Sequence, residues 1–220
     1  MTWFDTKNGQ RLLDLEEEIL TEFLEDKFGY YALQINTIGR NLLKKSRMKH
    51  HVMIDGKNKD IVCSSKHMPF DSDSIDLTIS QHFLEKNHDV SEFFNELYRI
   101  TIPGGRIIIF SFNPFSFAGF RNLTYFDRKF PWNTQFISMR NVQNKLKDCG
   151  FTLEHGIILD YQPLFSDNSY FSKNLEETGK RWFPLFGNIY FISAKKEVPG
   201  VTPLRPKWNK IKPSKAVTSK

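Results

Sequence analysis

The chain has 220 residues, of which 40% are hydrophobic and 15% aromatic. This length predicts one domain, and the composition excludes global disorder because it can fill a core. The formal net charge is +6 at pH 7, and this excess lies in residues 202–220, which contain basic but no acidic side chains. A segment of that composition predicts a flexible tail that either solubilises the protein or makes a weak contact with nucleic acid.

The chain also lacks the patterns of several other protein classes. Its first residues show no basic stretch followed by an apolar one, and no apolar run is long enough to span a membrane. The two cysteines, Cys63 and Cys149, are isolated and lack the spacing of zinc ligands. We therefore expect a cytoplasmic protein with buried thiols, no membrane span and no metal.

The first predicted element is an amphipathic helix over residues 11–28. Six apolar side chains share a broad face of this helix, and five glutamates lie mostly on the opposite face. The apolar set is Leu12, Leu15, Ile19, Leu20, Phe23 and Leu24, and the acidic set is Glu16, Glu17, Glu18, Glu22 and Glu25. We expect the helix to pack on a sheet with its acidic face in solvent, and to stop at Gly29.

Short apolar runs predict the strands that follow. They cover residues 30–35, 51–54, 61–63, 75–79 and 107–110. Between the last two runs, apolar side chains recur at helical spacing up to Ile100, and residues 103–105, Pro-Gly-Gly, then turn the chain. The run at 107–110 is continuous, which is typical of a strand covered on both faces. Alternating strands and helices predict a parallel sheet with ligand-binding residues at the strand ends.

The second half of the chain predicts one helix and two more strands. The helix covers residues 138–149, with Ser138 as its N-cap and Gly150 as its stop. The strands cover residues 151–159 and 188–194. Two further segments are rich in aromatic residues. Residues 115–136 suit a nucleotide-stacking surface or a lid packed on the domain, and residues 161–186 suit the wall of a substrate pocket.

An ordered set of short motifs over almost fifty residues resembles one known family. The set comprises Met68-Pro69-Phe70, Ser74-Ile75-Asp76-Leu77, Leu84-Glu85, Glu96-Leu97-Tyr98-Arg99-Ile100 and Pro103-Gly104-Gly105. It is similar to the class I S-adenosylmethionine-dependent methyltransferases, in the group called methyltransferase type 11. Short sequence segments at residues 112–116, 119–121 and 202–208 extend the similarity to an uncharacterised bacterial branch of this family. The resemblance implies an α/β, Rossmann-like fold of seven strands, mostly parallel with an antiparallel last strand, over residues 1–201.

The resemblance also implies where S-adenosylmethionine binds. In the family a Gly-rich loop follows the first strand, an acidic residue after the second strand bonds the ribose hydroxyls, and residues after the third and fourth strands complete the site. The matching positions here are Asn36, Thr37 and Gly39, then Asp55, then Ser65 and Met68, then Ser80 and His82. Two positions depart from the family pattern. The first loop has one glycine in place of Gly-x-Gly-x-Gly, and Ser64 or Ser65 replaces the adenine-binding Asp.

His82 is the first candidate for a catalytic residue, and Tyr161, Glu176 and Glu177 are further possibilities. His82 follows the strand at residues 75–79, and histidine titrates near neutral pH, so it suits the base that removes a proton from the methyl acceptor. The alternative is a histidine that lines the pocket or packs under the neighbouring helix. Methyl transfer needs alignment more than any particular side chain, so no catalytic residue follows from the fold itself.

Two function classes stay open at this point. The first is a methyltransferase acting on an unknown small molecule or macromolecule, and the second is a methyltransferase-like binding protein that has lost affinity for the cofactor. The degenerate first loop favours the second class, whereas Asp55 and residues 80–85 favour the first, which we expect. An RNA-binding module would rest on the basic tail alone.

Overall fold

The computed structural model describes residues 2–36, 38, 40–54, 67–86, 90–124, 131, 134–162, 164 and 185–197. The helices are η1 (Trp3–Asp5), α1 (Lys7–Leu24), η2 (Leu43–Lys45), α2 (Val90–Ile100), α3 (Phe117–Thr124) and α4 (Met139–Asp148). The strands are β1 (Phe28–Asn36), β2 (Arg47–Ile54), β3 (Ile75–Gln81), β4 (Thr101–Phe112), β5 (Phe151–Leu159) and β6 (Ile189–Lys196).

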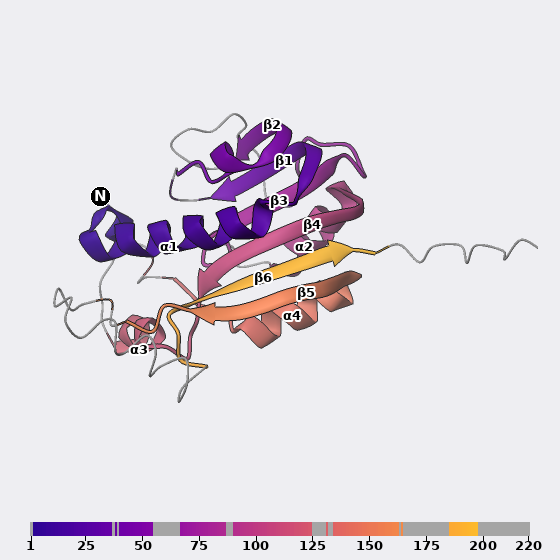
Figure 1. The fold of residues 1–220 in the computed structure, drawn as a ribbon. Coiled ribbons are helices and arrows are strands. Elements are labelled where there is room, and N and C mark those ends of the chain that lie inside the picture. Colours follow the sequence, from indigo (N-terminus) through magenta and orange to yellow (C-terminus); the bar gives the residue numbers. More distant parts are fainter. Residues whose placement is uncertain are drawn as a thin grey trace, which may run out of the picture.

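One sheet organises the described residues, with six strands in the order β2-β1-β3-β4-β6-β5 (Figure 1). Strands β2, β1, β3 and β4 run parallel, whereas β6 is antiparallel to both β4 and β5. This confirms the predicted α/β fold with a mostly parallel sheet and an antiparallel last strand. The seventh strand, predicted at residues 61–63, lies outside the described residues, as does the predicted domain boundary at residue 201.

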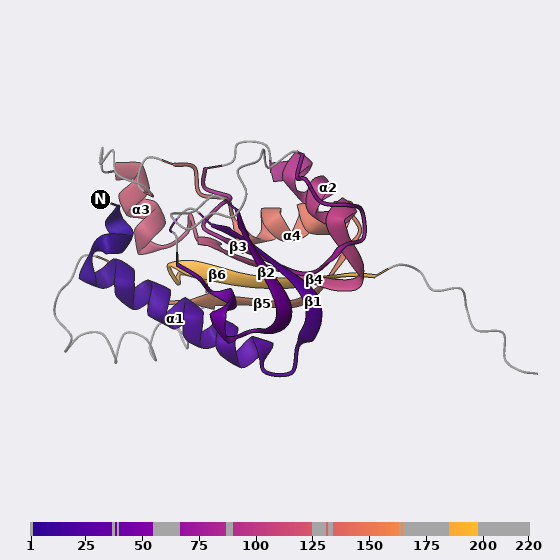
Figure 2. The same ribbon diagram turned by 90° about the horizontal axis from the view of Figure 1, so that it is seen from above.

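Helices cover both faces of the sheet, so the protein has three layers. Figures 1 and 2 show α1 across one face and α2 and α4 against the other. Successive side chains of a strand point to opposite faces, so β4 contributes to two separate cores. Ile108 and Phe110 belong to the core under α1, and Ile107 and Ile109 to the core under α2 and α4. The continuous apolar run at residues 107–110 therefore predicted a doubly covered strand correctly.

Helix α1 ends at Leu24 and Gly29 lies in β1, so the predicted helix stop at Gly29 is wrong. The helix also differs from its predicted orientation at one glutamate. The helix starts at Lys7, where the Thr6 side chain accepts a hydrogen bond from the Gly9 amide. Leu12, Leu13 and Leu20 pack in the core as an apolar face should, but Glu16 is also fully buried, with 0% of its surface exposed. The prediction that this carboxylate lies on the solvent face is wrong, because Glu16 has polar partners on the sheet.

The connection between β1 and β2 is shorter than the usual parallel crossover. Parallel neighbours are joined by about a dozen residues or more, usually including an α-helix. Here residues 37–46 make the link, and in their described part only the short turn η2 is helical. The Gln34 side chain receives a hydrogen bond from the Leu42 amide and donates one to the Arg40 carbonyl. The chain therefore folds back over β1.

Capping and turn residues predicted the two ends of helix α4 correctly but a turn within β4 incorrectly. Helix α4 begins after Ser138, whose hydroxyl accepts from the Asn141 amide, and Gly150 ends it with a φ of +98°. Both are as predicted. Residues 103–105, predicted as a turn, lie within β4, where the pairing with β3 jumps from Thr101 to Arg106 across two residues of β3. The Pro-Gly-Gly sequence interrupts the ladder without ending the strand.

Candidate active site

The carboxyl ends of β1, β3 and β4 meet at one edge of the sheet, where open α/β sheets bind their ligands. Asn36 at the end of β1 is level with Gln81 at the end of β3, and Gln81 is level with Phe110 of β4. The chain leaves β3 through His82, whose φ of +49° is in the left-handed region. The polar side chains that follow β3 therefore collect at this edge.

His82 lies between two carboxylates in the interior. Its Nε2 is 2.8 Å from Oε1 of Glu16 in α1, and its Nδ1 is 3.0 Å from Oε1 of Glu85. None of the three side chains is exposed to solvent. The rings of Phe4 and Phe112 pack against the imidazole, with centroids 5.0 and 4.5 Å away. We call Glu16, His82 and Glu85 the buried triad.

The buried triad stabilises the protonated, positively charged form of the His82 imidazole. Burial by itself lowers the pKa of His82, but the charges and hydrogen bonds of Glu16 and Glu85 outweigh burial and raise this pKa to about 10. At neutral pH both ring nitrogens then carry protons and donate to the carboxylates. An imidazolium has no lone pair with which to accept a proton. This geometry argues against His82 as a general base and favours a histidine packed under its neighbours.

Further donors tie the triad to the sheet. Oε2 of Glu16 accepts a hydrogen bond of 2.6 Å from the Gln81 amide group. Oε1 of Glu85 also accepts from the Ser111 hydroxyl at 3.1 Å and from the Phe112 backbone amide at 2.8 Å. The triad therefore joins α1 to the ends of β3 and β4. Sequence reasoning missed the role of Glu16, although one signal was present: an acidic residue four positions from Leu12 and Leu20 on an apolar face.

A second buried network lies at the same edge, beside the end of β5 and the start of β6. Arg11 of α1 makes two hydrogen bonds to the Asp160 carboxylate, of 2.7 and 3.2 Å. Asp160 is fully buried and also accepts from the Asn188 side chain at 2.9 Å. The Asn188 carbonyl accepts from the Asn113 amide, and its side-chain oxygen accepts from the Ala118 amide. Nothing in the sequence marked Arg11, Asp160 or Asn188 as partners.

The structure describes three of the residues predicted to bind the cofactor. Ser80 is buried near the end of β3, level with Ile35 of β1, and its hydroxyl has no hydrogen-bond partner among the described residues. Met68 is buried in the same core as Ile35 and Ile54, and its amide donates to Glu96. His82 lies on the other face, toward α1. The remaining predicted positions lie outside what is described: the side chain of Asn36, and Thr37, Gly39, Asp55 and Ser65.

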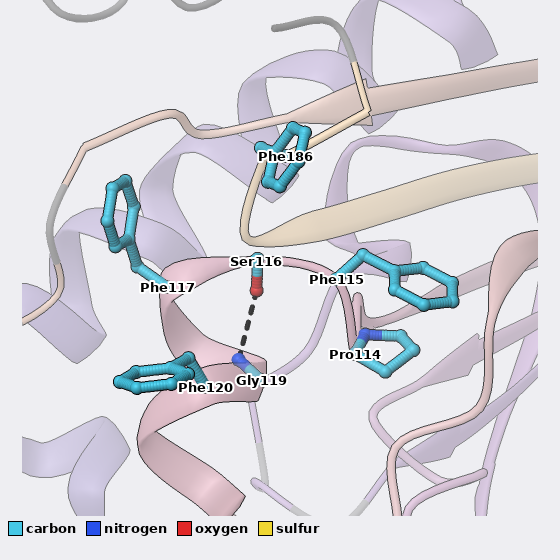
Figure 3. A pocket seen from close by; sticks show the side chains of 7 residues that line it. All are labelled: Pro114, Phe115, Ser116, Phe117, Gly119, Phe120 and Phe186. Carbon is cyan, nitrogen blue, oxygen red and sulfur yellow. Dashed lines mark hydrogen bonds between the residues drawn. The ribbon is translucent and has the colours of Figure 1, made fainter.

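A pocket opens beside these networks, where β4 leads into α3 (Figure 3). It has a volume of about 370 Å³. Its described lining is Pro114, Phe115, Ser116, Phe117, Gly119, Phe120 and Phe186. Residues 115–120 belong to the aromatic segment predicted from the sequence, and Phe186 to the predicted pocket wall. We call this cavity the phenylalanine pocket.

Within the described part of the chain, no group of three or more His, Cys, Asp or Glu side chains is placed to hold a metal ion. No helix among the described residues is both long and apolar enough to cross a membrane.

Comparisons with known proteins point to one family. A family model described as a methyltransferase domain matches residues 19–109. The uncharacterized protein YafS of Escherichia coli K12 is 24% identical over 215 residues, which cover 96% of this chain and 87% of that protein.

Solved structures of other proteins share this fold. A SAM-dependent methyltransferase from Archaeoglobus fulgidus aligns with a TM-score of 0.62 at 18% identity, over 84% of this chain and 94% of that one. The geranyl diphosphate C-methyltransferase of Streptomyces coelicolor aligns at 0.60 and 15%, over 85% of this chain and 80% of that one. At identities this low, the structural likeness shows a shared fold alone.

Proposed function

We propose that this chain, which belongs to the class I S-adenosylmethionine-dependent methyltransferases, is an active enzyme that methylates an acceptor still to be identified. The observation that carries the proposal is the methyltransferase-domain match to residues 19–109. That range contains β1, β2, β3, α2 and most of β4. Strands β1 and β3, which end within this range, contribute their carboxyl ends to the edge described above. S-adenosylmethionine is the cofactor of this family.

The polar atoms at this edge suit that cofactor. Three of the buried oxygens without a hydrogen-bond partner among the described residues lie in or just after the end of β3: Ser80 Oγ, Gln81 Oε1 and Glu85 Oε2. All three accept hydrogen bonds, and buried acceptors without a donor are costly. S-adenosylmethionine carries an ammonium group, two ribose hydroxyls and an adenine amine, which are donors. The described residues therefore fit the cofactor chemically, and we propose that it lies across the ends of β1 and β3.

The role of the protein in such a reaction is alignment. S-adenosylmethionine supplies an electrophilic methyl group on a sulfonium, and the acceptor must meet it in line. The buried triad holds the turn after β3 in one conformation, because His82 is bonded on both nitrogens and its amide donates to the Phe110 carbonyl. We infer that His82 positions this turn and does not remove the acceptor's proton.

Among the proposed cofactor contacts, that of Asp55 with the ribose hydroxyls can be tested most directly. The other proposed contacts are Asn36, Thr37, Gly39, Ser65, Met68 and Ser80. We expect Asp55→Ala to weaken binding of S-adenosylhomocysteine by roughly 1–3 kcal/mol, because a charged hydrogen bond to the ribose hydroxyls is lost. Isothermal titration calorimetry measures this directly. Asp148→Ala, at the exposed end of α4, is the matched control and should bind as the wild type does. Equal affinity of a folded Asp55→Ala variant would remove Asp55 from the site.

The alternative is a methyltransferase-like binding protein without cofactor affinity. It is favoured by two observations: the first loop has Gly39 as its one glycine, and the described part of residues 37–46 contains no α-helix. Titration of the wild type with S-adenosylmethionine and S-adenosylhomocysteine separates the two functions. Saturable binding supports the enzyme, and its absence at millimolar concentration supports the binding protein.

The basic segment at residues 202–220 is proposed as an independent tail that solubilises the protein or contacts nucleic acid weakly. We expect a chain that ends at Val201 to keep its melting temperature, because the excess charge lies in the tail and not in the core. Any RNA affinity of the full chain should fall with salt, since it would rest on basic side chains. Melting curves and RNA titrations at two salt concentrations test this. A large loss of stability would show that the tail packs on the domain.

We also propose a cytoplasmic location, because the sequence has two isolated cysteines and no disulfide framework. Cell fractionation followed by detection with an antibody tests this location. Recovery of the protein in a fraction other than the cytoplasm would contradict it.

A further inference from the structure

We propose that the phenylalanine pocket binds an uncharged, apolar portion of the methyl acceptor, an inference that rests on the proposed methyltransferase function. It names the class of substrate as a molecule with an aromatic or aliphatic hydrocarbon part. The pocket's lining, its exposed rings, its rigid frame and its place on the sheet support this.

The lining has the chemistry of an apolar site. Four phenylalanines and a proline supply most of it, and none of the described lining residues carries a charge. The one polar side chain, Ser116, is already bonded within the protein. Its hydroxyl donates to the Asn113 carbonyl at 2.6 Å and accepts from the Gly119 amide at 3.1 Å (Figure 3). A charged ligand would lose its hydration here without gaining a partner, whereas a hydrocarbon loses nothing.

The phenyl rings are unusually accessible for their size. Phe115, Phe117, Phe120 and Phe186 expose 66%, 55%, 67% and 51% of their surface. Scattered exposed apolar residues are ordinary, but a contiguous cluster marks a place where another molecule binds. The volume of about 370 Å³ is within the range of small-molecule sites. A bound hydrocarbon would remove these rings from water and gain the hydrophobic free energy of that burial.

The two walls of the pocket are held together by buried polar contacts. The Asn113 side chain donates to the carbonyls of Leu185 and Gly187, at 2.8 and 2.9 Å, so the segment with Phe186 is fixed to the end of β4. On the other wall, α3 packs against Pro114 at Gly119. A Cβ atom at Gly119 would lie 2.0 Å from the Pro114 carbonyl oxygen, so only glycine allows this approach. A pocket framed by backbone contacts is formed before a ligand arrives.

The pocket also lies on the correct side of the sheet. Pro114 is two residues beyond the last residue of β4, and Figure 1 shows α3 at the edge where β4 ends. Phe112, two residues before the pocket, packs its ring against His82 at the end of β3. The pocket and the proposed cofactor site are therefore neighbours along the carboxyl edge, as an acceptor site and a methyl donor must be.

The test uses the full chain and N-phenyl-1-naphthylamine, an uncharged aromatic fluorophore. We expect saturable binding to one site, weakened about tenfold or more by Phe120→Ser, which removes one apolar wall. Phe28→Ser is the matched control, because Phe28 is 83% exposed at the other end of β1 and should leave binding unchanged. Melting temperatures of both variants check that they are folded.

Three outcomes of the fluorophore titrations, and one of a competition experiment, would overturn the inference. The first three are binding that does not saturate, an equal loss for both variants, and tighter binding of the anionic analogue 8-anilinonaphthalene-1-sulfonate. Competition between the fluorophore and S-adenosylhomocysteine would also overturn it, since it would make the pocket the cofactor's own. If the wild type binds the fluorophore as expected but not S-adenosylhomocysteine, the methyltransferase function fails while the apolar site stands.

Discussion

The Glu85→Ala variant is expected to unfold with a free energy roughly 3–5 kcal/mol below that of the wild type, the cost of breaking a buried ion pair by removing one partner. Oε1 of Glu85 accepts from His82, from Ser111 and from the Phe112 amide. Alanine would leave three buried donors without their acceptor, and a buried imidazolium with a single carboxylate. Urea denaturation followed by circular dichroism measures the difference.

Two further variants make the result specific to the triad. Glu85→Gln keeps an acceptor of the same shape but not the charge, and should lose less stability than Glu85→Ala. Glu18→Ala removes an exposed glutamate of α1 and should change stability by less than about 0.5 kcal/mol. A loss below about 1 kcal/mol for Glu85→Ala would show that the triad contributes little, since that is the range of an ordinary hydrogen bond.

The stability of the wild type is expected to depend on pH through His82. Its pKa is raised from 6.5 to about 10 on folding, so the folded state holds a proton that the unfolded state releases. The contribution is fully present below pH 6.5 and is lost as the pH rises through about 10. Over that window the free energy of unfolding should fall by up to about 1.4 kcal/mol per pH unit.

The His82→Gln variant isolates this effect from other titrating groups. Glutamine cannot hold the charge between Glu16 and Glu85, so the variant should be less stable at pH 7 and lose less stability between pH 7 and 10. Urea denaturation of both proteins at several pH values gives the comparison. Parallel pH profiles for the two proteins would mean that His82 is not the imidazolium of a buried triad.

The sequence by itself determined the elements whose signals are local. Strand β5 covers residues 151–159 as predicted, and α4 has the predicted Ser138 cap. The doubly covered strand at residues 107–110 and the α/β class were likewise predicted correctly. Hydrophobic periodicity, capping and turn chemistry act between residues a few positions apart, so a linear pattern contains them. The family motifs at residues 68–105 are also local, and the family model matches residues 19–109.

Only the tertiary structure decided which polar residues meet at the edge of the sheet. Glu16 and His82 are 66 positions apart, and Arg11 and Asp160 are 149 apart. Each looks like an ordinary surface residue in its own segment, because a buried charge is tolerated only once its partner is in place. Likewise, the short link between β1 and β2 follows from how Gln34 holds residues 40 and 42. Such pairings depend on strand order and helix packing, and they leave no periodic trace in the chain.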